Sequence, residues 1–209
     1  MLKKRISFTS VTLPILFFSL VYISGCKSEG QKQNLLSQSE QPSKAETSPS
    51  SSVRSAALRD AAARGLIQDV RAELENGASV NTSDEMGRTA LMLSAFDGHT
   101  EIVRLLLSKG AQVDLRDSSG RTALMYSSSG PFPETVQLLL DWKADPNLAD
   151  GVERWTALMF AAGEGHLEVV KILLKHGADP SLKDVDGDTA LVFAQRNGHA
   201  KVVSLLTPK

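Results

Sequence analysis

Residues 155–179 read WTALMFAAGEGHLEVVKILLKHGAD, and variants of this stretch recur through the second half of the chain. The Thr-Ala-Leu that follows Trp155 begins at four positions, separated by 33, 34 and 33 residues: Thr89, Thr122, Thr156 and Thr189. A fixed period of this length indicates stacked structural repeats. From residue 55 onward the alignment of the units needs one inserted residue, which lies in the hairpin before Thr156.

Each unit is predicted to form a hairpin turn, a short helix, a glycine break, a second helix and a Gly-Ala exit. The four threonines suit the N-cap position, because a hydroxyl there accepts a hydrogen bond from an unpaired helical N–H. Gly98, Gly165 and Gly198 follow the first helices, where a left-handed residue is favoured. The second helices end at three Gly-Ala pairs: Gly77-Ala78, Gly110-Ala111 and Gly177-Ala178.

The second helices carry a wide apolar stripe, most clearly in residues 102–107 and 169–174. Charged residues such as Glu168 and Lys171 fall on the opposite side of the helix. Because one unit cannot cover its own stripe, adjacent units must stack. Residues 56–76 keep the spacing but lack the capping Thr and carry many charges, as expected of a terminal cap.

Taken together, these motifs resemble the ankyrin repeat. The resemblance rests on residues 184–191 (DVDGDTAL), 165–170 (GHLEVV) and 176–180 (HGADP), and it covers residues 55–209. It implies an all-α solenoid of about five helix–turn–helix repeats, including terminal caps, with β-hairpin tips. It also implies that the tips and first helices line a concave groove that binds another protein. The departures are modest: Ala stands where the family often has Pro, and Met where it often has His.

Residues 1–25 are typical of an export signal. Three basic residues, 3–5, precede an apolar run, 11–23, which contains a proline and is short for a membrane span. Residues 23–26 (ISGC) then resemble the lipobox of bacterial lipoproteins. That resemblance implies cleavage before Cys26 and lipidation of this cysteine. The alternative is an ordinary signal peptide with an incidental cysteine.

Lipidation predicts where the protein resides. Two or more acyl chains hold a protein to a bilayer, whereas one chain binds only marginally. We therefore expect a lipid-anchored protein of the bacterial cell envelope, facing the periplasm or the cell surface. Lys27 follows the cysteine where some inner-membrane lipoproteins carry Asp, and this favours the outer membrane.

Residues 26–54 form the expected tether between the lipid and the repeats. From Lys27 to about Val53 the chain is rich in Ser, Gln, Glu, Lys and Pro. Such a segment cannot bury enough apolar surface to offset its ordering entropy. A flexible chain of this length has an r.m.s. reach of about 30 Å. The repeat domain, residues 55–209, is thus expected to stand clear of the membrane.

The charge balance argues against nucleic acid as a partner. The chain has 23 basic and 24 acidic residues, and loss of residues 1–25 removes basic residues only. A mildly acidic chain without a basic stripe lacks the clustered positive charge that binds a phosphate backbone. Cys26 is the only cysteine, so the stability of the domain must come from packing rather than from a disulfide.

No pattern predicts catalysis, a metal site or a cofactor, so an enzyme is not expected. His99, His166 and His199 take equivalent positions in stacked repeats, and neighbouring repeats lie about 8–10 Å apart, too far for zinc ligation at ~2.0–2.1 Å. Residues 184–188 (DVDGD) partly match a calcium loop but lack its distal Glu, which favours a simple turn. Residues 127–129 (SSS) have neither a nucleophile elbow nor a partner base.

Candidate protein-binding residues lie on the first helices and hairpins. One row consists of Leu93, Tyr126, Phe160 and Phe193, which either pack into the core or anchor a partner. The ring of Trp155 is expected near the exposed tips rather than in the stack. Hairpin residues that differ between units are further candidates: Asp84, Glu85, Arg88, Ser118, Arg121, Glu153, Arg154, Asp186 and Asp188.

The third repeat departs from the pattern in three places. Ser127 and Ser128 replace small apolar residues, residues 130–133 (GPFP) replace the Gly-His turn, and Lys143 replaces a helix-ending glycine. A left-handed Lys costs roughly 1 kcal/mol. The repeat is either a tolerated weak unit or a contact loop, in which case Phe132 is the side chain to test.

These expectations combine into one function and an alternative. The favoured function is that of a monomeric, membrane-tethered scaffold or adaptor that binds another protein through the concave face and hairpin tips. The alternative is a stoichiometric accessory or immunity-type factor that protects or inhibits one envelope enzyme.

Overall fold

The computed structural model describes residues 50–208. The expected signal segment, the lipidation site Cys26 and the tether up to residue 49 lie outside the described residues. Ten helices follow one another in pairs: α1 (Ser51–Ala63), α2 (Ile67–Glu75), α3 (Ala90–Phe96), α4 (Thr100–Ser108), α5 (Ala123–Ser128), α6 (Pro133–Asp141), α7 (Ala157–Glu164), α8 (Leu167–Lys175), α9 (Ala190–Arg196) and α10 (Ala200–Leu206).

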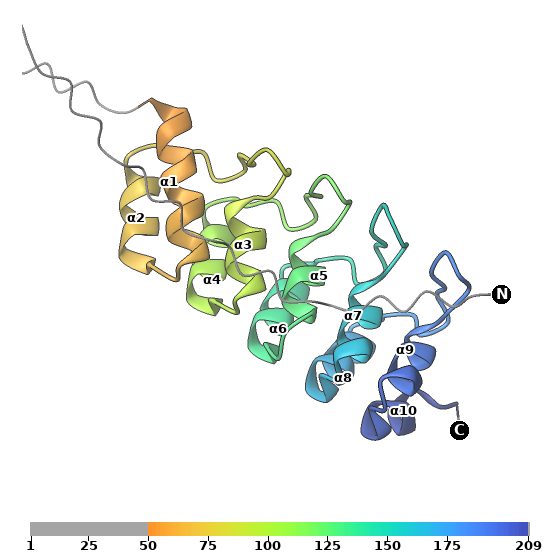
Figure 1. The fold of residues 1–209 in the computed structure, drawn as a ribbon. Coiled ribbons are helices and arrows are strands. Elements are labelled where there is room, and N and C mark those ends of the chain that lie inside the picture. Colours follow the sequence, from red (N-terminus) through yellow and green to blue (C-terminus); the bar gives the residue numbers. More distant parts are fainter. Residues whose placement is uncertain (1–49, 209) are drawn as a thin grey trace, which may run out of the picture. The chain divides into compact units, whose positions relative to one another are not determined.

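The five helix pairs stack in the order of the chain. Each first helix (α1, α3, α5, α7, α9) contacts the next first helix, and each second helix (α2, α4, α6, α8, α10) contacts the next second helix. Figure 1 shows the loops between pairs projecting on one side of the stack. The predicted repeat solenoid is therefore confirmed for residues 50–208.

The hairpin tips lack extended strands in this part of the chain. Isolated antiparallel bridges join Ser83 to Thr89 and Ala149 to Thr156. The expected β-hairpin tips are thus tight hairpin loops with, in two cases, a single bridge at the base.

The core lies between the two helix layers. The leucine that follows the capping threonine by two residues is 1–2% exposed at Leu91, Leu124 and Leu158. In the second helices, Val103, Val136 and Val170 are fully buried. Burial of one such side chain stabilises the fold by about 1.5–3 kcal/mol, so stacking these repeated positions supplies the main driving force.

Three of the four threonine caps form as predicted. Thr89, Thr122 and Thr156 accept hydrogen bonds of 3.3–3.4 Å from the N–H groups of Met92, Met125 and Met159. Thr189 also occupies the N-cap position, with extended backbone, but its side chain accepts no such bond. The Thr hydroxyl therefore orders the start of α3, α5 and α7 only.

The three turn histidines join neighbouring repeats, which supports the structural role favoured by the sequence analysis. In each case the ring Nε2 lies near a carbonyl oxygen of the preceding repeat. That oxygen belongs to a residue at the end of the first helix or within one residue of it. The pairs are His99–Ala63 at 3.3 Å, His166–Ser129 at 3.2 Å and His199–Gly163 at 2.8 Å. The imidazoles act as hydrogen-bonding spacers between repeats.

Phe132 occupies the corresponding place in the third repeat. Like the histidines, it is the N-cap residue of a second helix. Its ring packs so closely on two glycines that a Cβ added at Gly98 or Gly130 would lie 2.2 or 2.3 Å from it. Phe132 therefore replaces a hydrogen-bonding spacer with an apolar one.

The other irregular residues of the third repeat fit the same stack. Lys143 has a φ of 69°, as predicted for a residue in place of glycine. Ser127 and Ser128 are fully buried in α5, and the Ser127 hydroxyl donates to the Leu124 carbonyl oxygen. Within residues 50–208 the Ser128 hydroxyl has no hydrogen-bond partner.

The first helix begins four residues before the expected boundary at residue 55. α1 starts at Ser51, within the segment assigned to the tether. Ser55 explains the difference: its hydroxyl is buried, donates to the Ser51 carbonyl oxygen and accepts from the Ser79 N–H. The serine-rich sequence thus enters the domain through specific hydrogen bonds.

Among the described residues, no helix has the length and hydropathy needed to cross a bilayer.

Candidate functional site

The four hairpins share one hydrogen-bonding scheme built on an aspartate. Asp84, Asp117, Asp150 and Asp184 each donate a backbone N–H to the carbonyl oxygen of the residue that ends the hairpin, at 2.9–3.0 Å. The carboxylate Oδ1 of each accepts at least two backbone N–H groups of the same loop. Such Asp-centred turns hold a loop without strands.

At Asp84 this arrangement shifts the acidity of the carboxyl group. Burial opposes ionisation of Asp84, but hydrogen bonds from the Arg88 backbone, the Arg88 side chain and the Met86 N–H outweigh burial and lower the pKa. The hairpin therefore keeps its organising charge at neutral pH.

Consecutive hairpins are also bonded to one another. Ser118 N–H donates to Met86 O at 2.9 Å, and Val185 N–H donates to Glu153 O at 3.1 Å. Between them, Gly151 N–H donates to Ser119 O at 2.7 Å. The four tips form one continuous, hydrogen-bonded edge, so their backbones are held in fixed relative positions.

The inserted residue enlarges the third of the four hairpins, residues 150–155. Its closing bond runs from Asp150 to Trp155, whereas the other three loops close over one residue fewer. Arg154 has a φ of 61° where Gly87, Gly120 and Gly187 stand in the other loops. A non-glycine residue in this conformation costs of order 1 kcal/mol, and such strain is often found at functional sites.

The expectation that Trp155 lies near the exposed tips is wrong. Its ring is half-buried and packs edge-to-face against Phe160, with centroids 5.2 Å apart, and against Phe193, at 4.8 Å. The Asp150 carboxylate accepts the Trp155 N–H and holds the residue at the base of the hairpin. Aromatic pairs of this geometry contribute about 0.5–1.5 kcal/mol beyond their burial, which draws the indole towards the first helices.

The row of Leu93, Tyr126, Phe160 and Phe193 combines the two roles left open by the sequence. All four side chains are half-buried. The three aromatic members pack against the core on one side and remain partly accessible on the other. We call the surface formed by this row, Phe96, Trp155 and Arg121 the first-helix face.

Tyr126 is tied to the hairpin before it. Its hydroxyl donates to Asp117 Oδ2 at 2.6 Å. Burial, together with the hydrogen bond and the charge of Asp117, raises the pKa of Tyr126 to about 12. The hydroxyl is therefore a permanent donor at physiological pH.

Two arginines at equivalent hairpin positions have different partners. Arg88 contacts Asp84 Oδ2 through Nε at 2.9 Å and through a terminal nitrogen at 2.8 Å. Arg121 makes no such contact with Asp117, and its guanidinium instead lies over the Phe160 ring, 5.4 Å from the centroid. The first-helix face thus contains a cation stacked on an aromatic side chain.

Phe96 completes this part of the face and was not identified from the sequence. It is 52% exposed and packs edge-to-face on Tyr126 at 5.9 Å. A pocket of about 50 Å³ lies here, lined by Phe96, Arg121, Met125, Tyr126, Ser129 and Phe160. The positions equivalent to Phe96 hold Ser129, Gly163 and Arg196, so no repeating pattern pointed to it.

The other predicted hairpin residues are divided between exposed and paired side chains. Exposed residues are Glu85, Ser118, Glu153, Arg154 and Asp186. Asp188 is half-buried and forms an ion pair with Arg196 at the end of α9. Two exposed apolar side chains, Val152 and Val185, lie on neighbouring tips and were also missed.

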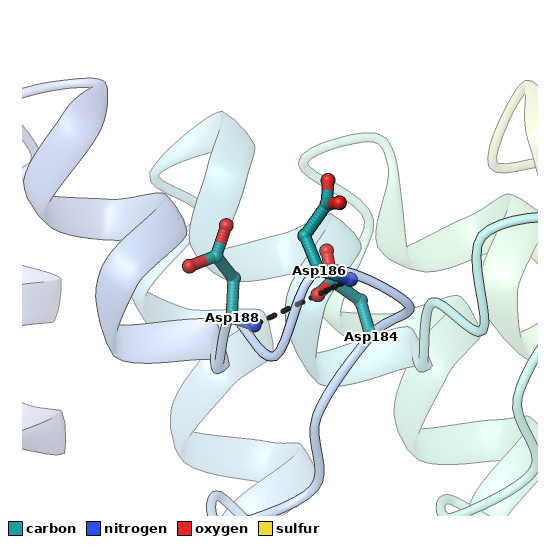
Figure 2. Close-up of side chains that lie close together, drawn as sticks. All are labelled: Asp184, Asp186 and Asp188. Carbon is teal, nitrogen blue, oxygen red and sulfur yellow. Dashed lines mark hydrogen bonds between the residues drawn. The ribbon is translucent and has the colours of Figure 1, made fainter.

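The acidic loop at residues 184–188 is a turn of the common type. Its three aspartates offer oxygen atoms within 4.8 Å of one another. Figure 2 shows the Asp186 and Asp188 side chains pointing outward while Asp184 accepts hydrogen bonds from their backbone N–H groups. Because Asp84 and Asp117 make the same bonds in loops without an acidic cluster, the cluster is explained by the hairpin itself.

Comparison with known proteins agrees with this architecture. A family model described as ankyrin repeats (3 copies) matches residues 58–150 and 132–209, which is well over half of the chain. Among curated proteins, none matches the chain in sequence. The helix pairs, glycine turns and hairpin loops recur within the matched residues, and the chain belongs to the ankyrin repeat family, whose members are protein-interaction scaffolds.

Proposed function

We propose that the domain binds a partner protein through the first-helix face and the hairpin tips of its third to fifth repeats. One observation carries the proposal: Trp155, Phe160 and Phe193 form a half-buried aromatic cluster on a preordered edge. Aromatic residues and arginine dominate the energetics of protein interfaces. Because the hairpins are already bonded to one another, binding would require little further ordering.

The cluster also lies beside the strained hairpin of residues 150–155. Arg154 and Glu153 are exposed directly beside it, and Val152 is 59% exposed. An interface of this composition has an apolar centre and a charged rim, which is the arrangement that excludes water from the central contacts. The partner is therefore expected to cover both the hairpin and the aromatic cluster.

We further propose that the domain is held at a bacterial membrane through lipid on Cys26, with the outer membrane favoured. The support is the sequence around Cys26, because this part of the chain lies outside the described residues. Cys26→Ser should move the processed protein to the soluble fraction or block its processing. Detergent-phase partitioning and the mass of both proteins are the measurements, and unchanged membrane association of a normally processed variant would reject the anchor.

The binding proposal is tested by crosslinking in envelope extracts, followed by quantitative mass spectrometry. Trp155→Ala and Phe160→Ala should each reduce recovery of the specific partner about tenfold or more, as for interface anchors worth ≥ 2 kcal/mol. Trp142→Ala is the matched control, since this tryptophan is 46% exposed at the end of α6, a second helix. Equal recovery with all three variants, each checked for folding by circular dichroism, would refute the proposed site.

A further inference from the structure

The different environments of Arg88 and Arg121 have a clear local cause. In the second repeat, Asp84 Oδ2 is free to pair with Arg88, because Leu93 has no polar group to compete. In the third repeat, the equivalent oxygen of Asp117 accepts from the Tyr126 hydroxyl. The first-helix residue at the position of Leu93 and Tyr126 thus determines whether the hairpin arginine forms an ion pair with the aspartate of its own loop.

Arg121 is left with unused donors. Its Nε forms a long ion pair with the buried Asp150 Oδ2 of the next hairpin, at 3.8 Å, but within residues 50–208 neither of these two buried atoms has a hydrogen-bond partner. The other oxygen of Asp150 already accepts three backbone N–H groups of its hairpin. The Arg121 side chain is 42% exposed. Its terminal nitrogens donate no hydrogen bond to another described residue.

The pocket beside Arg121 is small. Its volume of about 50 Å³ exceeds the roughly 10–15 Å³ needed to hold one water molecule, which leaves room for a small polar group such as a carboxylate. Its walls are Phe96, Tyr126 and Phe160, and the hydroxyl of Ser129 is already committed to the Tyr126 carbonyl oxygen. The guanidinium is therefore the hydrogen-bond donor that the pocket offers to a ligand.

We propose that Arg121 binds the side-chain carboxylate of an Asp or Glu in a partner polypeptide, whose apolar neighbours contact Phe96 and Phe160. A planar guanidinium binds a carboxylate through two parallel N–H···O bonds, which are stronger than bonds to neutral acceptors. Because Phe96 and Arg121 are partly exposed, a partner that covers them would remove water from the ion pair and strengthen it. The domain as a whole carries more acidic than basic residues, so the attraction is local to this pocket. This proposal rests on the proposed protein-binding function and specifies the chemistry of its partner.

Tyr126 is a positioning residue in this scheme. Tyr126→Phe retains the ring that lines the pocket but releases Asp117 Oδ2. Asp117 can then pair with Arg121, as Asp84 does with Arg88. Loss of one hydroxyl should therefore weaken carboxylate binding without changing the apolar wall.

The test uses the purified full-length protein and a displayed library of random 12-residue peptides. Selected peptides should contain Asp or Glu beside Leu, Ile, Val or Phe. In isothermal titration, changing that Asp or Glu to its amide should weaken binding about tenfold, as should Arg121→Gln. Tyr126→Phe should weaken binding about three- to tenfold, and the matched control Arg88→Gln by less than twofold.

The outcomes separate this proposal from the proposed function. In one outcome, Trp155→Ala weakens binding of the selected peptides while Arg121→Gln and the amide substitution leave their affinity unchanged. That result would refute the carboxylate site but support the proposed binding face. If the wild-type protein selects no peptide, or none that responds to either variant, both fail. If Arg121→Gln unfolds, the peptide amide series and Tyr126→Phe decide the proposal. An unchanged affinity in those two measurements would overturn it.

Discussion

The second and third repeats have hairpins of the same length and nearly the same backbone hydrogen bonds, yet they present different chemistry. In the second repeat, Asp84 and Arg88 neutralise each other within the loop. In the third, Tyr126 engages Asp117, and Arg121 lies over Phe160 of the next repeat. A regular scaffold can thus change its surface through one side chain, without any change in the backbone that supports it.

The same two repeats also differ in their turns. His99 both packs on Gly65 and contacts the Ala63 carbonyl oxygen of the first repeat, whereas the Phe132 ring only packs on Gly98 of the second. Gly110 ends α4 with a φ of 87°, and Lys143 follows α6 with a φ of 69°. Paired substitutions at these equivalent positions measure how far the third repeat differs from the second in its contribution to stability.

The largest expected effect is in the core. Leu106→Ala and Leu139→Ala remove equivalent leucines that are both fully buried, so each should lower the free energy of unfolding by about 2–5 kcal/mol. Urea denaturation followed by circular dichroism is the measurement. A much smaller loss of unfolding free energy for Leu139→Ala than for Leu106→Ala would indicate a loosely packed third repeat. It would also contradict the equivalence of the two positions.

The turn spacers should have the next largest effect. Phe132→Ala should cost about 2–3 kcal/mol, somewhat less than a fully buried phenylalanine, because the ring is half-buried. His99→Ala loses one hydrogen bond and should cost about 1 kcal/mol. Phe96→Ala, with an exposed ring, serves as the control for loss of an aromatic side chain. A stability change for Phe132→Ala no greater than that of the control would contradict the packing role.

Titration of Tyr126 sharpens the hairpin comparison. The sequence has two tyrosines, so Tyr22→Phe leaves Tyr126 as the sole phenol. Its ultraviolet absorbance should change near pH 12, and Asp117→Asn should move this change towards pH 10. Because the folded-state pKa is raised, the contribution of this group to stability is complete below about pH 10 and is lost as the pH rises through about 12.

Circular dichroism must be recorded at each pH of this titration, because unfolding also exposes the phenol. A transition near pH 10 in protein that remains folded would show that the Tyr126–Asp117 hydrogen bond is absent in solution. It would also remove the reason for the different partners of Arg88 and Arg121.

The helix ends should show the smallest effect. Lys143→Gly relieves a left-handed lysine and should raise stability by about 0.5–1 kcal/mol. Gly110→Ala is the reverse change and should lower stability by about 1 kcal/mol; a Cβ at Gly110 meets no atom within 4 Å, so the cost is conformational alone. Thermal melts of both variants test the pair. Shifts of the same sign would contradict the equivalence of the two positions.

Much of the fold could be predicted from the sequence because its signals are local and repeated. The helix-opening threonines, the left-handed glycines and even the strained Lys143 depend on a few neighbouring residues, and the 33-residue period reports them several times over. The structural role predicted for the turn histidines agrees with their contacts to carbonyl oxygens of the preceding repeat.

The candidate site was predicted less completely. Trp155 is predicted at the tips because charged residues, Arg88, Arg121 and Asp188, hold its position in the other hairpins, but two aromatic neighbours draw its ring onto the first helices. Phe96 was missed because its equivalents share no property. Both failures concern contacts between repeats, which a comparison of aligned positions does not reveal.

The sequence by itself determined the repeat, its two helices, its caps and turns and the row of side chains on the first helices, since these follow from spacing and backbone preference. The tertiary structure alone decided which side chains of the row remain open, where Trp155 lies, and which aspartate each arginine meets. The physical reason is that a hydrogen bond or ring contact between repeats depends on competition among several nearby groups. At Asp117 the Tyr126 hydroxyl occupies the oxygen that, in the equivalent Asp84, contacts Arg88, and Arg121 lies over the Phe160 ring instead.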